Sequence, residues 1–158
     1  MKKLIIIILS VILFATTACA SENRSSKSSD KGDFSNMKIK IEITSDTGNH
    51  NLTATLTDNS SARAFYKLLQ KETVTIDMHE YGNFEKVGAL STSLPRNDTQ
   101  ITTEPGDIIL YQGNQITIYY DTNSWNFTRL GRVDGVTKSE LKQILGKENV
   151  PDVFSIMK

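Results

Sequence analysis

The chain reads MKIKIEIT over residues 37–44, and this stretch decides the fold class. Its three isoleucines alternate with polar residues, so one side of the extended chain is apolar, as in a half-buried β-strand. Residues 52–57, LTATLT, alternate in the same way after a polar turn at residues 45–49. Two alternating segments on either side of a glycine-containing turn predict a β-hairpin.

A helix is expected after the hairpin, because apolar residues at positions 62, 65, 68 and 69 follow helical spacing. Asp58, Asn59 or Ser60 supplies its N-cap. Residues 74–78 return to the alternation of a strand. Residues 81–103 show no clear period, and we expect a long loop there with short extended pieces.

The next segments predict strands again. Residues 108–111 and 115–121 are joined by Gly113-Asn114, which favours a tight hairpin turn. Residues 125–133 are expected to be extended.

The second helix has the clearest local signals. Thr137 and Glu140 have the spacing of a capping box, Val136 and Leu141 that of a hydrophobic staple, and Gly146 suits the C-terminal cap. A last strand is expected over residues 153–156. About eight strands and two short helices predict a mainly β fold, a closed barrel, which leaves no unpaired edge.

Composition limits the function. The 158 residues suit one domain, and 18 Lys and Arg balance 18 Asp and Glu, so no basic excess indicates a nucleic-acid partner. One cysteine excludes an internal disulfide, and two histidines offer little for a metal site. We expect no metal and no cofactor.

The first residues have the features of a secretory signal: two lysines, an apolar run over residues 4–15, and small residues after it. Ending in Ala18-Cys19, the segment resembles a bacterial lipoprotein signal, although Thr16 stands where that pattern usually has Leu. The resemblance implies cleavage after residue 18 and lipidation of Cys19, with palmitate among the acyl groups. An ordinary signal peptide and an uncleaved anchor are the alternatives.

This resemblance predicts the location and the organisation of the chain. Residues 1–18 are expected to be the signal peptide, and residues 37–158 the folded domain. The serine-rich, charged residues 19–36 between them predict a flexible tether. The domain is then expected on the extracytoplasmic side of the cell membrane, held there by lipid on Cys19.

Several short stretches of the domain together resemble the bacterial cyclophilin-like family. They are MKIKI at 37–41, TLTDN at 55–59, PGDI at 105–108, YQGN at 111–114 and SWNFTRLG at 124–131. Their order and spacing cover nearly the whole domain. The resemblance implies a cyclophilin-type β-barrel whose ends are closed by helices.

The resemblance does not carry over to the isomerase site. Isomerase-active cyclophilins have an Arg, a Phe five residues later, and then Gln-Gly-Gly. Arg63, Arg96, Arg129 and Arg132 are followed at that distance by Leu, Ile, Asp and Thr. We therefore expect ligand binding without catalysis, with a divergent prolyl isomerase that assists folding of secreted proteins as the alternative; no catalytic residue is assigned.

The candidate pocket residues are Tyr111, Trp125, Phe127 and Arg129. Strand alternation puts the last three on one face, where a guanidinium beside aromatic rings suits a peptide or small ligand. Tyr119 and Tyr120 are candidates for the same pocket. Alternatively, the rings pack locally and Arg129 pairs with an acid. Docking of another envelope protein is a third possibility.

The remaining polar residues have plainer interpretations. Arg96 is expected in a solvated loop or over a pocket mouth, and Asp107 is expected to stabilise a turn. His50 and His79 are expected to be surface residues. Asp77, Glu80 and Glu85 show no spacing that fixes a catalytic carboxylate pair.

Overall fold

The computed structural model describes residues 34–145 and 149–157. The predicted signal peptide, Cys19, most of the predicted tether and the expected C-terminal cap at Gly146 therefore lie outside the described residues. In the part that is described, no helix combines the length and apolarity needed to cross a membrane.

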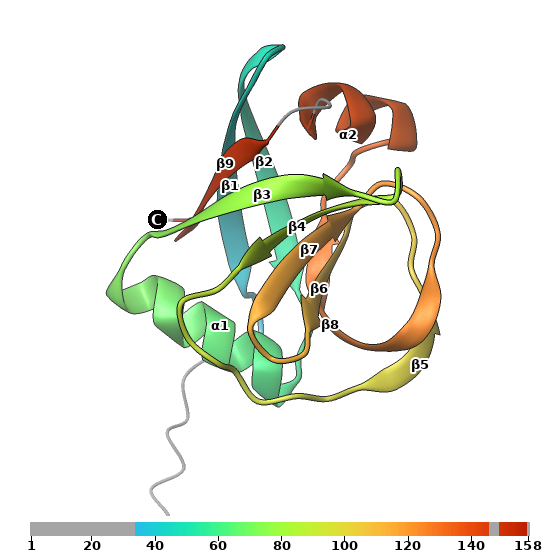
Figure 1. Cartoon of the computed structure of the whole chain (residues 1–158). Helices are drawn as coiled ribbons and strands as arrows, with labels where there is room; N and C mark the ends of the chain where they lie inside the picture. The colour runs from blue at the N-terminus through green and yellow to red at the C-terminus, as the bar shows by residue number, and fades with distance from the viewer. Residues whose placement is uncertain (1–33, 146–148, 158) are drawn as a thin grey trace, which may run out of the picture. The chain divides into compact units, whose positions relative to one another are not determined.

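The described residues form nine strands and two helices (Figure 1). The strands are β1 Lys38–Ser45, β2 Gly48–Leu56, β3 Val74–Tyr81, β4 Glu85–Ala89, β5 Thr99–Thr102, β6 Asp107–Tyr111, β7 Gln115–Tyr119, β8 Ser124–Val133 and β9 Val150–Ile156. The helices are α1 Ser60–Lys71 and α2 Lys138–Leu145.

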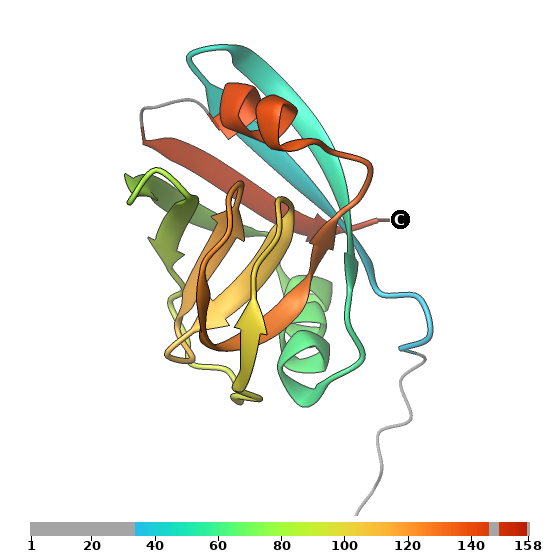
Figure 2. The ribbon, with the colours of Figure 1, turned by 90° about the vertical axis from the view of Figure 1, so that its right-hand side faces the viewer.

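Eight of these strands form a closed antiparallel barrel, as the sequence predicted. Their order is β2-β1-β9-β3-β4-β7-β6-β8, and β8 pairs in turn with β2. The C-terminal β9 lies between β1 and β3, so the two ends of the domain meet in one sheet (Figure 2). Strand β5 stands outside this ring and pairs with the first half of β8.

Gly131 allows the barrel to close. It lies opposite Leu56 where β8 meets β2. A Cβ at this position would come within 2.5 Å of the carbonyl oxygen of Thr55, which is far inside normal contact distance. The lack of a side chain therefore permits the two backbones to approach and form the last pairing of the ring.

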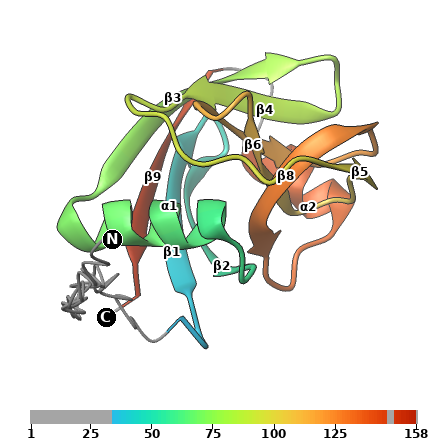
Figure 3. The same cartoon turned by 90° about the horizontal axis from the view of Figure 1, so that it is seen from below.

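Inward-facing apolar side chains fill the barrel, and the helices cover its ends (Figures 1 and 3). Phe65 of α1 is fully buried, and its ring meets the edge of Phe154 of β9 at 5.8 Å between centroids. Leu141 and Leu145 of α2 are also fully buried. Helical spacing of apolar residues thus gives each helix one face that packs on the core.

The predicted start signals of both helices are confirmed. Asn59 is the N-cap of α1, and its side chain accepts a hydrogen bond from the backbone N–H of Ala62 at 2.8 Å. At α2 the backbone N–H of Thr137 donates to Glu140 Oε2 at 2.8 Å, and the Glu140 N–H donates to Thr137 Oγ1 at 3.3 Å. These two bonds are the reciprocal pair of a capping box.

The loop with short extended pieces that was expected at residues 81–103 contains two short strands, β4 and β5. The sequence did not predict that one of them, β4, is a full member of the barrel. Its sequence, EKVGA, shows no apolar alternation, yet its first four residues are buried. Lys86 points into the barrel and is fully buried, with its Nζ 3.7 Å from Glu80 Oε2. Burial on both faces, with a charged residue inside, removes the period-2 signal.

The domain also extends a little before Met37. The guanidinium of Arg63 on α1 lies over the ring of Phe34, 5.1 Å from its centroid, and Lys67 Nζ lies 5.5 Å from it. Phe34 also packs against the main core. Phe34, which lies within the segment predicted to be a tether, therefore contacts α1.

Candidate ligand-binding site

The strands β6 and β7 carry apolar side chains on both faces. Ile108 and Leu110 belong to the main core, whereas Ile109 and Tyr111 belong to a second cluster. Because neighbouring residues of a strand point to opposite faces, this second cluster lies on the outer face of the barrel. Its buried members are Ile109, Tyr119 and Phe127, with Phe84, Ile101 and Tyr111 packed against them.

A pocket of about 480 Å³ opens beside this outer cluster. Residues of β3, β4, β6, β7 and β8 line it, so that neighbouring strands form a continuous floor. The lining residues include Glu85, Tyr111, Thr117, Tyr119, Trp125 and Phe127. Its volume falls in the range of about 300–1,000 Å³ that is usual for small-molecule sites.

The aromatic walls of the pocket contact one another. The ring centroids of Tyr119 and Phe127 are 5.7 Å apart, and those of Tyr111 and Phe127 are 6.3 Å apart. Such tilted and edge-to-face pairs are favourable arrangements for aromatic side chains. Buried Phe127 therefore holds its neighbours in position, and their outer surfaces form an apolar wall.

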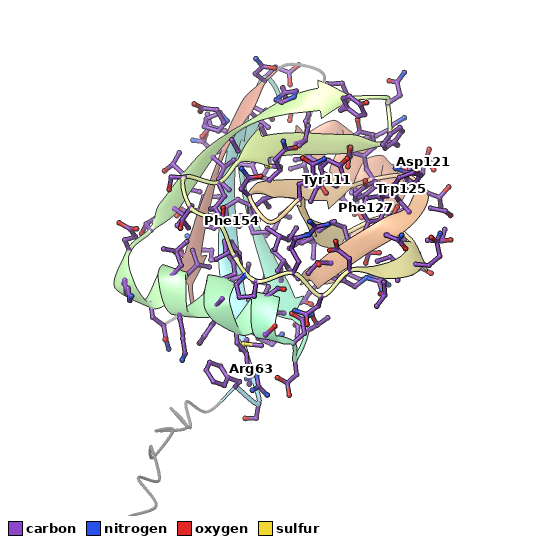
Figure 4. All side chains as sticks on the ribbon, turned by 60° about the horizontal axis from the view of Figure 1, so that its bottom comes forward. Arg63, Tyr111, Asp121, Trp125, Phe127 and Phe154 are labelled. Carbon is purple, nitrogen blue, oxygen red and sulfur yellow. The ribbon has the colours of Figure 1, made fainter. Side chains whose placement is uncertain are left out.

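The structure brings together three of the four residues predicted for a pocket. Tyr111, Trp125 and Phe127 line the same cavity and lie close together in Figure 4. Trp125 stands at the rim with 60% of its surface exposed, whereas Phe127 is buried. Tyr119 also lines the pocket, but Tyr120 belongs to the main core.

Arg129 is not among the lining residues, because an acid holds it elsewhere. Its Nη2 donates to Asp107 Oδ2 at 2.8 Å, while Arg132 Nε donates to Asp107 Oδ1 at 2.9 Å. Asp107 is fully buried and also accepts the backbone N–H of Glu104 at 3.0 Å. The expected turn bond of Asp107 is thus present, together with two ion pairs that join β6 to β8.

Glu85 forms the acidic part of the pocket floor. It is 7% exposed and lies directly opposite Tyr119 in the pairing of β4 with β7. Burial raises the pKa of its carboxyl, and the nearby Tyr119 and Thr117 hydroxyls partly offset that rise. Burial and the Glu85 carboxyl raise the pKa of Tyr119 as well, so its hydroxyl stays protonated.

Two polar atoms in this floor have no hydrogen-bond partner. They are Glu85 Oε2 and Thr117 Oγ1, both buried. Among the other described residues, the only buried side-chain N or O atom without a hydrogen-bond partner is Arg129 Nε. Buried polar atoms are nearly always paired in folded proteins, so two unpaired atoms in one pocket are a signal of a binding site.

A second hollow of about 470 Å³ adjoins the pocket, since Tyr111 and Trp125 line both. Arg96 and Asp98 form an ion pair in its wall. Arg96 therefore lies near the pocket but is already paired. Its side chain is 56% exposed, as expected for a solvated loop residue, and it also lines the hollow beside the pocket.

The sequence did not single out Glu85, Thr117 or His79 as pocket residues. His79 is exposed and lies on β3 beside the pocket, whereas His50 contacts the Thr47 hydroxyl at 3.0 Å. Within residues 34–145 and 149–157, no three His, Cys, Asp or Glu side chains gather as metal ligands would. No local pattern marks Glu85, because its burial depends on strands that are distant in sequence.

Comparison with known proteins agrees with this architecture. The model of the cyclophilin-like family matches residues 45–154. A solved structure of McbB in complex with tryptophan is similar in fold, with a TM-score of 0.53 and 13% sequence identity. The match covers 74% of this chain and 44% of the McbB chain. Among curated proteins, no match is found.

Proposed function

The chain belongs to the cyclophilin-like family, and on this premise we propose that it is a membrane-anchored lipoprotein whose domain binds a peptide or a small ligand without catalysis. The observation that carries the proposal is the pocket of about 480 Å³ on the outer face of the barrel. Aromatic walls and a few polar groups in the floor are the usual composition of a ligand site.

A small aromatic ligand fits this pocket well. Tyr111 and Trp125 offer ring surface at the mouth, and Phe127 supports them from below. McbB was solved in complex with tryptophan, a ligand small enough for a cavity of this volume. This supports a ligand of amino-acid or short-peptide size.

The position of Arg129 favours binding over isomerisation. Prolyl isomerases lower the barrier by stabilising the twisted amide in the pocket, and a guanidinium there supplies the donor. Here the Arg129 guanidinium is held by buried Asp107 and does not line the pocket. The sequence also lacks the phenylalanine that follows the arginine in isomerase-active cyclophilins.

The proposed anchor rests on the N-terminal sequence. Two lysines, an apolar run and Ala18-Cys19 match the order of a lipoprotein signal. In cells fed with labelled palmitate, we expect label on the wild type and none on Cys19→Ser. Label on both, or on neither, would remove the lipid anchor from the proposal and leave the pocket untouched.

Trp125 provides a direct test of binding, because it is the only tryptophan in the chain and stands at the pocket rim. We would titrate full-length protein in mild detergent with N-acetylphenylalaninamide and follow the Trp125 emission. A saturable change is expected. Tyr111→Ala should weaken binding about tenfold, since removing a ring from an apolar wall costs about 1–1.5 kcal/mol.

The matched control is Tyr66→Ala, which removes a ring from α1 that lies against the main core and not in the pocket. It should leave the affinity unchanged. No saturable change, or equal loss in both variants, would argue against the pocket.

A proline-containing tetrapeptide serves as the test of catalysis. If wild type accelerates its cis–trans exchange and Arg129→Ala does not, isomerisation replaces ligand binding as the proposed function.

A further inference from the structure

The pocket floor combines a buried acid with unpaired acceptor atoms. Glu85 is more than nine-tenths buried and lines the pocket, and its Oε2 has no hydrogen-bond partner. Thr117 Oγ1 is also unpaired and lies two residue pairs along the same two strands, on the same face as Glu85. A buried carboxylate oxygen without a donor costs more than almost any other unpaired polar atom.

The only basic side chain among the described lining residues is that of His79, which is exposed. The pocket wall contains no Lys or Arg, and Glu85 is its only acid. Lys86 is next in sequence, but it points to the other face of β4 and pairs with Glu80, whose side chain is 31% exposed. The hydroxyls of Tyr119 and Thr117 approach the carboxyl without cancelling the effect of its burial.

The missing partner must therefore donate hydrogen bonds and carry positive charge. A protonated primary amine meets both needs, because it has three N–H donors in a compact head. One donor suits Glu85 Oε2, and a second suits the oxygen of Thr117. Glu85 need only turn about its last side-chain bond to offer either oxygen, a rotation with a broad and shallow energy profile.

The rest of the pocket suits the remainder of such a ligand. Tyr119 stacks on Phe84 with centroids 6.0 Å apart and contacts Phe127 at 5.7 Å, so aromatic surface surrounds the acidic floor. A cation near aromatic faces gains further attraction from the rings. The wall formed by Tyr111 and Trp125 then covers an apolar or aromatic body.

We propose that the pocket binds a small molecule with a protonated amine on an apolar or aromatic body. The amine lies against Glu85 and Thr117, and the body lies against Tyr111, Phe127 and Trp125. This inference rests on the proposed function, since it names the ligand class of the same pocket.

Three probes with the same aromatic body separate charge from shape. They are 2-phenylethylamine, which is cationic, 2-phenylethanol, which is neutral, and 3-phenylpropanoate, which is anionic. With full-length protein in detergent and Trp125 emission as the signal, the amine should bind about tenfold more tightly than the alcohol. That factor reflects the greater strength of a charge-assisted hydrogen bond. The anion should bind most weakly.

Two variants test which residues create the preference. Glu85→Gln keeps the shape of the side chain and should bring the ratio of amine to alcohol affinity to about one. Thr117→Val keeps the shape of the second residue and should weaken amine binding about threefold, by removing a single neutral acceptor. Glu72→Gln, an exposed residue outside the pocket, should leave the ratio unchanged.

The outcomes separate the inference from the proposed function. If amine and alcohol bind equally in wild type, or if Glu85→Gln preserves the preference, the amine ligand is refuted. In that case saturable binding of N-acetylphenylalaninamide still supports a ligand pocket. If neither that compound nor any phenyl probe changes the Trp125 emission, the pocket function and the amine ligand both fall.

Discussion

Replacing Asp107 by Asn tests the role of the buried acid that holds two arginines of β8. Asp107 is fully buried and accepts hydrogen bonds from Arg129 at 2.8 Å and Arg132 at 2.9 Å. A third bond comes from the backbone N–H of Glu104 at 3.0 Å. The amide has the shape of the carboxylate but no charge, and its NH₂ group must replace one of the two acceptor oxygens.

The loss of unfolding free energy in Asp107→Asn depends on how far the three side chains are buried. Removing one partner of a buried ion pair costs about 3–5 kcal/mol. The lower end applies here, because the side chains of Arg129 and Arg132 are 34% and 45% exposed and regain water when the charge is lost. Loss of one charge-assisted bond alone accounts for about 1.5–3 kcal/mol. We therefore expect Asp107→Asn to lower the free energy of unfolding by about 3 kcal/mol.

Urea unfolding of the full-length protein, followed by far-ultraviolet circular dichroism, measures this difference. The matched control is Glu104→Gln, which changes the other carboxylate bound to Arg132. That contact is 2.6 Å long, but its Glu104 side chain is 62% exposed, so the expected loss is below about 1 kcal/mol. If both substitutions cost the same small amount, the buried acid does not join β6 to β8 as we infer.

Two further predictions concern the N-terminal cap of α1 and the pocket floor. Asn59→Ala should lower the free energy of unfolding by about 1–2 kcal/mol, because it removes the N-cap bond to Ala62 and a 2.8 Å bond to the Arg129 carbonyl. The control in the same urea assay is Asn49→Ala, which changes an exposed residue. An effect of Asn59→Ala no larger than that of the control would contradict this prediction. Glu85→Gln should grow more stable relative to wild type as pH rises. Burial raises the pKa of the folded carboxyl, so wild-type stability is full below the unfolded-state pKa and falls as pH rises through the folded-state pKa. Urea unfolding across a pH series measures this, and parallel profiles for the two proteins would count against an uncompensated acid.

Membership in the cyclophilin-like family accounts for the fold, whereas the residues that line the pocket determine which ligand it binds. The ligand site proposed here uses the outer face of β4, β6, β7 and β8, which the barrel holds rigidly. Sites built on strands keep their geometry better than sites on loops. The amine-binding floor and the aromatic wall are therefore held by the same strands of the barrel.

Much of the candidate site could be predicted, and one residue shows why the rest could not. Strand alternation is a local signal and predicts that Trp125 and Phe127 share a face, with Tyr111 as a further candidate; all three line one pocket. Arg129 has the same local position as its neighbours, yet a buried acid on another strand holds it away from the cavity. A side chain can contact a ligand only if no other residue already binds it. Such partners come from strands that are distant in sequence, so the local pattern does not reveal them.

The sequence by itself determined the elements whose signals lie within a few residues: the first hairpin, the N-terminal caps of both helices and the mainly β class. Only the tertiary structure decided that β4 is a barrel strand, that Gly131 permits closure against β2, and that Glu85 is buried with an unpaired oxygen. The physical reason is common to all three. Burial and backbone contact arise between segments far apart in the chain, so no short stretch carries their signal.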